Sequence, residues 1–163
     1  NVKCFTAAAK AAGLDVIDHV DNTKDSTANA ATLAADELIR FPTVQAFWAY
    51  NDSSALGISA SIIAAGKTIY DGKNEDGTMV FGINGDQDAI LAIKEGRLTG
   101  TWDPDSYATG LAVATAMDRA MAEPTAPQKE LVVKAKLFTF ENIESWVDGP
   151  KRGYALGNIP LVD

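Results

Sequence analysis

Three short clusters of the sequence hold polar side chains suited to binding a small polar molecule. They read Tyr50-Asn51-Asp52, Asn84-Gly85-Asp86 and Trp102-Asp103-Pro104. Planar amides and carboxylates can bridge two hydroxyl groups, and an aromatic face suits the C–H surface of a sugar ring. Because Asn and Asp are also common helix N-caps, capping is an equally good interpretation of each cluster taken alone. Together the clusters predict these ligand-binding residues: Tyr50, Asn51, Asn84, Trp102 and Asp103.

The sequence shows no recognisable catalytic constellation. Its single histidine, His19, lies near the start of the chain without the partners of a proton relay. Residues 57–61 lack the second glycine of a nucleophile elbow, and no phosphate- or dinucleotide-binding loop occurs. Asp103 could be interpreted as the phosphorylated Asp of a response regulator. Such a protein needs further acidic side chains from its first strand around that residue, and they are missing here. We therefore expect a protein that is not an enzyme and that needs no cofactor.

A metal site and a reactive thiol are both disfavoured. Residues 71–77, DGKNEDG, are rich in oxygen ligands, but an EF-hand frame through them would start at Gly72 and end on Ile83. The loop is therefore predicted to be a solvated turn without a metal. Cys4, the single cysteine, lies in an Ala-rich helical pattern and is predicted to be a small buried apolar residue.

Composition and charge narrow the choice of partners. The chain has 163 residues, 47% hydrophobic and 22% charged, which suits one globular domain with a core. Its formal net charge is −8, and its longest basic cluster is Lys151-Arg152, so nucleic acid is a poor partner. No apolar run reaches the roughly 18 residues that span a bilayer. No signal peptide is visible, although a mature chain would also lack one.

Alternating helix and strand patterns place the three polar clusters directly after strands. The spacing of apolar residues predicts helices over residues 2–12, 26–40, 51–66, 86–96, 106–121 and 141–147, and strands over residues 14–20, 44–50, 79–83, 98–102 and 131–138. Residues 123–128 are predicted to be a connector. The alternation predicts an α/β fold, with a doubly wound, mostly parallel sheet of about five or six strands and helices on both faces. The strand over 44–50 is expected to be buried on both faces.

These segments resemble the ribose-binding-protein branch of the type 1 periplasmic solute-binding proteins. Residues 44–57, VQAFWAYNDSSALG, are similar to the family's apolar strand followed by Asn-Asp and Ala-Leu-Gly. Residues 80–86, VFGINGD, are similar to its strand ending in Gly-x-Asp-Gly, with Asn84 in place of the usual Asp. Residues 89–105 and 138–147 are similar to its hinge region and its closing strand and helix. The Trp-Asp-Pro hinge looks most like members that bind rhamnose-type deoxysugars or autoinducer-2.

The resemblance implies the C-terminal half of a receptor that closes two lobes on a small sugar-like ligand. It implies delivery of the ligand to an ABC transporter permease or a chemoreceptor, with the protein in the periplasm or outside the cell. Asn51 stands where the family has a sugar-hydroxyl ligand, Asn84 where it has a hydroxyl-accepting Asp, and Asp103 at the hinge. Residues 1–149 are expected to form the ligand-binding lobe, with a hinge crossing near 103–130, and residues 150–163 an irregular tail.

Two expectations concern the full-length protein to which the chain belongs and the surface that covers one of its helices. The effector domain of a LacI-type transcription regulator shares this fold and also binds sugars, which would place the protein in the cytoplasm. Residues 106–123 carry an apolar stripe that needs a covering surface: Tyr107, Leu111, Ala114, Met117 and Met121. Because the family's first lobe would cover this stripe, we expect a fragment of a longer protein. The missing N-terminal lobe would belong to the same protein or to a separate chain. Alternatively, dimerisation of this chain would cover the stripe.

Overall fold

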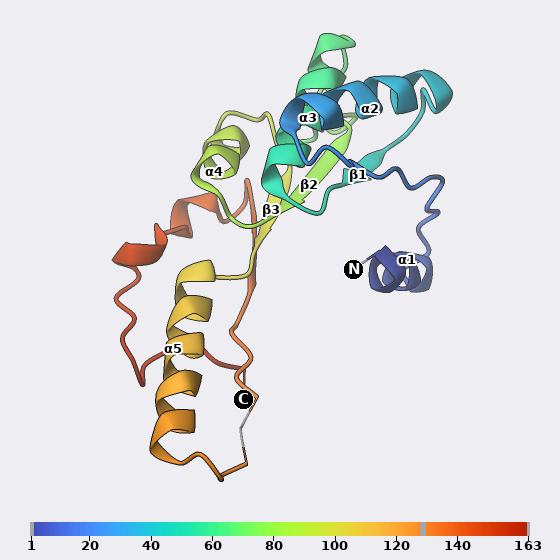
Figure 1. The fold of residues 1–163 in the computed structure, drawn as a ribbon. Helices are drawn as coiled ribbons and strands as arrows, with labels where there is room; N and C mark the ends of the chain where they lie inside the picture. Colours follow the sequence, from blue (N-terminus) through green and yellow to red (C-terminus); the bar gives the residue numbers. More distant parts are fainter. Residues whose placement is uncertain (1, 128–129, 163) are drawn as a thin grey trace.

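A computed structural model describes residues 2–127 and 130–162, which form a four-stranded sheet with helices packed against it (Figure 1). The helices are α1 (Val2–Ala11), α2 (Thr27–Arg40), α3 (Asp52–Ala64), α4 (Gln87–Lys94) and α5 (Ser106–Ala122), with short 3-10 helices η1 (Ile143–Ser145) and η2 (Gly149–Lys151). The strands are β1 (Ala46–Trp48), β2 (Met79–Ile83), β3 (Gly100–Asp103) and β4 (Lys136–Thr139). Their order is β1-β2-β3-β4, with β1, β2 and β3 parallel and β4 antiparallel to β3. The predicted α/β fold with a mostly parallel sheet is confirmed.

Small residues let α2 and α3 approach closely on one side of the sheet. A side chain on Gly57 would come within 2.2 Å of the Thr27 carbonyl oxygen, so only glycine fits at this crossing. The Ser61 hydroxyl donates to the Ala31 carbonyl at 2.6 Å across the same crossing. Helix α3 packs on β1 and β2, and α4 packs on β3. The main apolar core lies between these layers: Leu38, Ala55, Ile62, Val80, Ile90, Ile93, Leu98 and Phe138.

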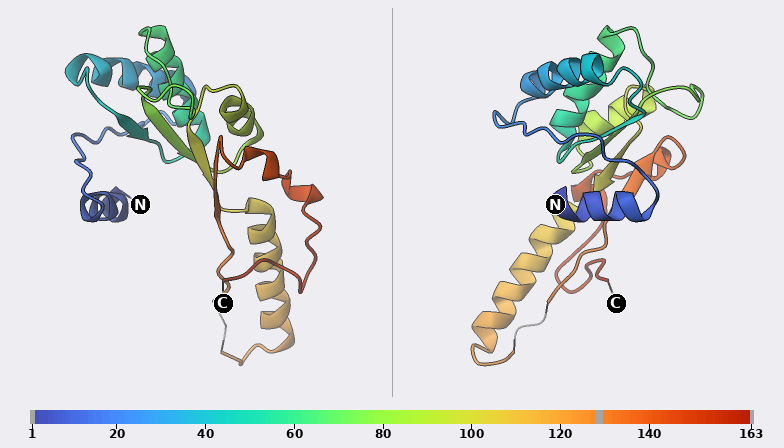
Figure 2. Two further views of the ribbon diagram at one scale, coloured as in Figure 1. Left: turned by 180° about the vertical axis from the view of Figure 1, so that it is seen from behind. Right: turned by 90° about the vertical axis from the view of Figure 1, so that its right-hand side faces the viewer.

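Helix α1 reaches the opposite face of the sheet through one aromatic contact. The rings of Phe5 and Trp48 are stacked with their centroids 4.5 Å apart. Phe47 packs against the core, so strand alternation places Trp48 on the other face. The rest of α1 stands away from the sheet in Figure 1 and in the left view of Figure 2. For this reason Cys4 is exposed, and the prediction that it is buried was wrong.

Residues 14–20 form no strand, so the first predicted strand was wrong. Leu14 and Ile17 are 64% and 47% exposed in an irregular segment that leads from α1 towards α2. A strand needs a neighbour to take up its backbone hydrogen bonds. Within the described residues β1 is the end strand of the sheet and pairs only with β2, so this segment has no strand beside it. The sheet therefore has four strands rather than the predicted five or six.

Three other elements differ in the structure from their predicted burial or length. Because β1 is an end strand, Ala46 is exposed and its two neighbours are only half-buried, against the predicted burial on both faces. The last strand begins at Lys136, since residues 131–135 hold only an isolated bridge between Val133 and Leu161. The helix predicted over 141–147 is reduced to η1. Gln128 of the predicted connector and Asp163 of the predicted tail lie outside the described residues.

Helix α5, residues 131–135 and the C-terminal tail form a second part of the molecule that extends away from the sheet (Figures 1 and 2). The tail runs beside residues 132–134, where Lys134 N–H donates to Pro160 O at 2.8 Å and Val162 N–H donates to Val132 O at 2.7 Å. Met117 and Met121 of the predicted stripe are 60% and 72% exposed. In the described part of the chain, no helix is both long and apolar enough to cross a membrane.

Candidate functional site

The three polar clusters meet at one edge of the sheet, here called the carboxyl edge and made of residues 50–52, 84–86 and 102–103. Asp52, the first residue of α3, joins the clusters and is fully buried. Its Oδ1 accepts a hydrogen bond from the Thr101 hydroxyl of β3 at 2.6 Å, and its Oδ2 accepts one from the Asp86 N–H at 2.8 Å. The Gly85 N–H donates to the same Thr101 hydroxyl at 3.2 Å. One buried carboxylate therefore fixes the loop after β2 against the start of α3.

The carboxylate of Asp52 has no cation beside it among its hydrogen-bond partners. Burial raises the pKa of Asp52, although the hydrogen bonds from the Thr101 hydroxyl and the Asp86 N–H act in the opposite direction. Gly82 of β2 makes room for this side chain, since a Cβ there would lie 2.2 Å from Asp52 Oδ1. The position of Asp52 thus depends on a glycine in the neighbouring strand.

At the end of β1, Asn51 and Tyr50 both contact Asp25. Asn51 is the N-cap of α3, and its Oδ1 accepts the Ser54 N–H at 2.8 Å. Its Nδ2 donates to Asp25 Oδ1 at 3.2 Å, and the Tyr50 hydroxyl donates to the same oxygen. This hydrogen bond to Asp25 raises the pKa of Tyr50. The capping interpretation of Asn51 is correct, and the cap leaves its amide N–H groups directed towards the exposed rim.

At the end of β2, Asn84 is exposed and held in an unusual backbone conformation. Its φ of 134° lies in a region that side chains rarely adopt, at a cost of about 1–3 kcal/mol. Its N–H donates to the Trp102 carbonyl at 2.9 Å, which ties the loop to β3. The Asn84 amide makes only a long contact of 3.4 Å with Asp86 Oδ2. The side chain is therefore positioned by its backbone and remains open to an external partner.

At the end of β3, Asp103 and Trp102 point to opposite faces of the sheet. Asp103 is 3% exposed, and its carboxylate accepts the Asp105 N–H at 2.7 Å and an Arg152 N–H at 2.6 Å. It shares its face with Thr101 by strand alternation. Trp102 lies on the other face and is 46% exposed. The structure thus places Asp103 on the same face of the sheet as Thr101, and Trp102 on the opposite face.

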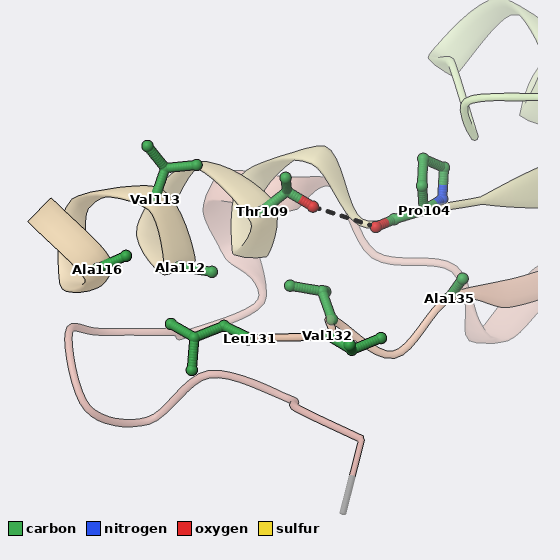
Figure 3. A pocket seen from close by; sticks show the side chains of 9 residues that line it. Pro104, Thr109, Ala112, Val113, Ala116, Leu131, Val132 and Ala135 are labelled. Carbon is green, nitrogen blue, oxygen red and sulfur yellow. Dashed lines mark hydrogen bonds between the residues drawn. The ribbon is translucent and has the colours of Figure 1, made fainter. Parts of the chain in front are cut away.

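A separate apolar groove of about 460 Å³ lies between α5 and residues 131–135 (Figure 3). Its lining is Pro104, Thr109, Ala112, Val113, Ala116, Leu131, Val132, Val133 and Ala135. The one side-chain hydroxyl in this lining, on Thr109, is directed at the Pro104 carbonyl, 3.4 Å away. The groove offers no carboxylate and no amide side chain, so it suits a polyhydroxylated ligand far less well than the carboxyl edge does.

Residues 71–77 form a turn stabilised within itself. Asp71 Oδ1 accepts the N–H groups of Lys73 and Asn74, both at 2.9 Å, and these bonds lower the pKa of Asp71. No group of three or more His, Cys, Asp or Glu side chains in residues 2–127 and 130–162 could hold a metal ion.

Sequence reasoning did not select four residues that belong to the carboxyl edge or contact it: Asp25, Asp52, Thr101 and Arg152. Asp52 was visible beside Asn51, but nothing local shows that it is buried or that Thr101 donates to it. Asp25 and Ser26 were both possible caps of the helix over 26–40, and the structure gives that role to Ser26. Arg152 was noted only for its charge, in a tail predicted to be irregular.

The family comparison agrees with the resemblance found in the sequence. The profile described as "Periplasmic binding protein domain" matches residues 2–124. No curated protein sequence matches the chain.

Solved structures share the fold over most of the chain. A periplasmic ribose ABC transporter protein from Conexibacter woesei has a TM-score of 0.77 and 20% identity, covering 98% of this chain and 50% of its own. A solute-binding protein from Agrobacterium vitis with bound D-fucose has a TM-score of 0.71 and 23% identity, covering 97% and 49%. One from Bacillus halodurans with bound myo-inositol has a TM-score of 0.61 and 26% identity, covering 74% and 39%. The chain thus spans half or less of the length of these proteins.

Proposed function

Because the chain belongs to the periplasmic binding protein family, we propose that it is the C-terminal lobe of the substrate-binding component of an ABC sugar-uptake system. The lobe forms one wall of a cleft and binds a small sugar-like ligand reversibly. The prediction that the chain is not an enzyme agrees with the family and with its solved neighbours, which are described as binding proteins. The ligands found in those neighbours, D-fucose and myo-inositol, are neutral polyols.

The observation that carries this proposal is the carboxyl edge itself. Asp52 fixes the loops after the parallel strands, so Asn51 and Asn84 hold their amides at the same end of the sheet. Open α/β sheets bind ligands at the carboxyl ends of their strands. An array of fixed amide and carboxylate groups matches a ring of hydroxyls, which act as both donors and acceptors.

Each predicted site residue receives a specific role in this proposal. At the exposed end of β1, here called the β1 rim, the free N–H of the Asn51 amide and the Tyr50–Asp25 pair bind hydroxyl groups of the ligand. The Asn84 amide, with a donor and an acceptor, replaces a carboxylate that could only accept. Asp103 accepts a ligand hydroxyl beside its internal hydrogen bonds. Trp102, which is 46% exposed at the end of β3, offers its ring for stacking on the C–H surface of the ligand.

The remaining parts of the proposal concern the whole protein. The exposed Met117 and Met121 of α5 mark a surface for an N-terminal lobe. That the chain spans about half the length of the ribose-type neighbour agrees with a two-lobed protein. Such a protein works in the periplasm or outside the cell and hands its ligand to an ABC permease. A signal peptide encoded upstream in the gene would support this assignment, whereas a helix-turn-helix there would indicate a LacI-type regulator.

Calorimetric titration of the intact protein against D-fucose, D-allose, L-arabinose and myo-inositol tests the proposal. We expect saturable binding of at least one compound, with the compound recovered unchanged. Chemical turnover of a bound sugar would refute the non-enzymatic role, and failure of all neutral polyols to bind would refute the ligand class. The isolated chain is the matched control, because it supplies one wall of the cleft and should bind weakly or not at all.

A further inference from the structure

The C-terminal tail supplies an arginine to the junction between β3 and α5. Arg152 follows η2, and its Nη2 donates to Asp103 Oδ2 at 2.6 Å while its Nη1 donates to Asp105 Oδ2 at 2.8 Å. Its Nε donates to the Val147 carbonyl at 2.7 Å, which fixes the plane of the guanidinium. The side chains of Arg152, Asp103 and Asp105 are only 13%, 4% and 7% exposed. This is a nearly buried ion cluster rather than a surface salt bridge.

Contacts besides the ion pair with Arg152 also restrict the position of Asp103. Its Oδ1 accepts the Asp105 N–H at 2.7 Å. Gly85 lies directly against it, because a Cβ on Gly85 would come within 2.5 Å of Asp103 Cγ. Asp105 itself adopts a left-handed φ of 52° and caps α5 by accepting the Ala108 N–H at 3.0 Å. The Asp103 carboxylate is therefore held in one orientation at the end of β3.

The charges of the cluster show why the arginine is needed. Two carboxylates this close together and this buried are costly without a cation. Burial acts to lower the pKa of Arg152, but its hydrogen bonds to Asp103 and Asp105 outweigh that effect and raise it. Tyr154 also contacts the cluster, and burial and a hydrogen bond to Asp105 raise the pKa of Tyr154. Within the described part of the chain, Arg152 is thus the only cation that forms an ion pair with either carboxylate.

We propose that Arg152 is a positioning residue of the ligand site, which orients Asp103 and balances its charge so that this carboxylate receives a neutral hydroxyl group. The inference rests on the proposed function. Each Asp103 oxygen uses one lone pair internally and keeps another for a ligand. With the guanidinium present, the site does not require a cationic ligand. Arg152 lies beyond residues 2–124, so the family profile does not include it.

Calorimetry on the intact protein tests this role with two matched variants, titrated with D-fucose, D-allose, L-arabinose and myo-inositol. Arg152→Gln removes the guanidinium, and Lys151→Gln removes the same charge from the exposed neighbouring residue of the tail. We expect Arg152→Gln to weaken binding about tenfold or more, because Asp103 loses its orienting donor. Lys151→Gln should bind like the wild type. Thermal unfolding curves ensure that both variants are compared well below their unfolding temperatures.

Charge rescue separates positioning from simple support of the fold. The double variant Asp105→Asn/Arg152→Gln removes one carboxylate along with the arginine, and Asn retains the ability to cap α5. It should recover part of the lost affinity.

Wild-type affinity in Arg152→Gln, or an equal loss in Arg152→Gln and Lys151→Gln, would overturn this inference alone. Failure of the wild type to bind any of the four compounds would instead overturn the proposed function on which it rests. If Arg152→Gln does not fold, Arg152→Lys and the double variant decide, since lysine keeps the charge but not the two-point contact. Equal affinity of Arg152→Lys and the wild type would then show that orientation by the guanidinium is not required.

Discussion

Two regions of the molecule use carboxylates in opposite ways. One is the β1 rim, made of Asp25, Tyr50 and Asn51, and the other is the β3–α5 junction, made of Asp103, Asp105 and Arg152. At the rim, Asp25 and Tyr50 are exposed, and Asn51 directs amide hydrogens outwards once its oxygen has capped α3. At the junction, Asp103 and Asp105 are nearly buried, and their partners come from the chain itself. Buried polar groups are costly unless paired, so the internal pairs of the junction contribute to stability and hold Asp103 in place for a ligand, whereas the exposed groups of the rim contribute mainly to ligand contact. Substitutions in the two regions should therefore affect different quantities.

The largest expected effect is on stability, from loss of the buried carboxylate that joins the two regions. Asp52→Ala leaves the Thr101 hydroxyl and the Asp86 N–H without their acceptor, and we expect the free energy of unfolding to fall by about 3 kcal/mol. Urea denaturation of the isolated chain measures this change. Asp36→Ala on the exposed surface of α2 is the control and should change stability little. Equal stability of the two variants would mean that Asp52 does not hold the carboxyl edge together.

At the rim the expected effect is on affinity rather than on stability. Asn51→Ser keeps an oxygen to cap α3 but removes the amide donor, so it should weaken sugar binding by the intact protein about tenfold and leave unfolding almost unchanged. Asn51→Ala should lose affinity to a similar extent and also lose stability, by about 1 kcal/mol. Calorimetry and denaturation of both variants separate the two effects. If Asn51→Ser binds as well as the wild type, the Asn51 amide is not a ligand contact.

The pH dependence of stability gives a smaller effect with a definite sign. The pKa of Asp52 is raised in the folded protein, so folding favours its protonated form. Its contribution to the free energy of unfolding is therefore fully present below the unfolded pKa, about 3.9, and is lost as pH rises through the raised folded value. The stability of the wild type relative to Asp52→Asn should fall over that window. A relative stability that rises with pH would contradict the burial described for this carboxyl group.

The smallest effect concerns the phenol at the rim. Because a hydrogen bond to Asp25 raises the pKa of Tyr50, Asp25→Asn should let Tyr50 ionise at a lower pH. Ultraviolet difference titration of the isolated chain detects this as an earlier onset of tyrosinate absorbance. Asp21→Asn, which removes a nearby exposed carboxylate, should leave the titration unchanged. An unaltered onset in Asp25→Asn would show that the Tyr50–Asp25 contact does not persist in solution.

The sequence predicted those features of the molecule that depend on local residue patterns. The strand over 79–83 and the helix beginning at Ser106 were located by apolar spacing, and the three polar clusters were recognised because each follows a strand. These features depend on local patterns. The predicted strand over 14–20 was wrong because strand formation depends on a neighbour, which a local apolar pattern does not reveal.

The buried contacts of the site could not be predicted for a related reason. Asp52 and Thr101 are 49 positions apart, as are Asp103 and Arg152, and neither pair has a local signature. Asp103 was correctly placed at the end of a strand, but its burial and its orientation depend on a tail residue that reads as irregular. The half-buried Asn51 and the exposed Asn84 were easier to select, since a capping or loop position is evident from spacing alone.

Mapping ligand-induced shifts of backbone amides by NMR tests the central claim most directly. The intact protein is labelled with nitrogen-15 and titrated with the sugar that binds best in calorimetry. We predict that the shifts within this chain concentrate on residues 50–52, 84–86 and 102–103 of the carboxyl edge. Shifts confined to the apolar groove between α5 and residues 131–135, with the carboxyl edge unchanged, would contradict the account.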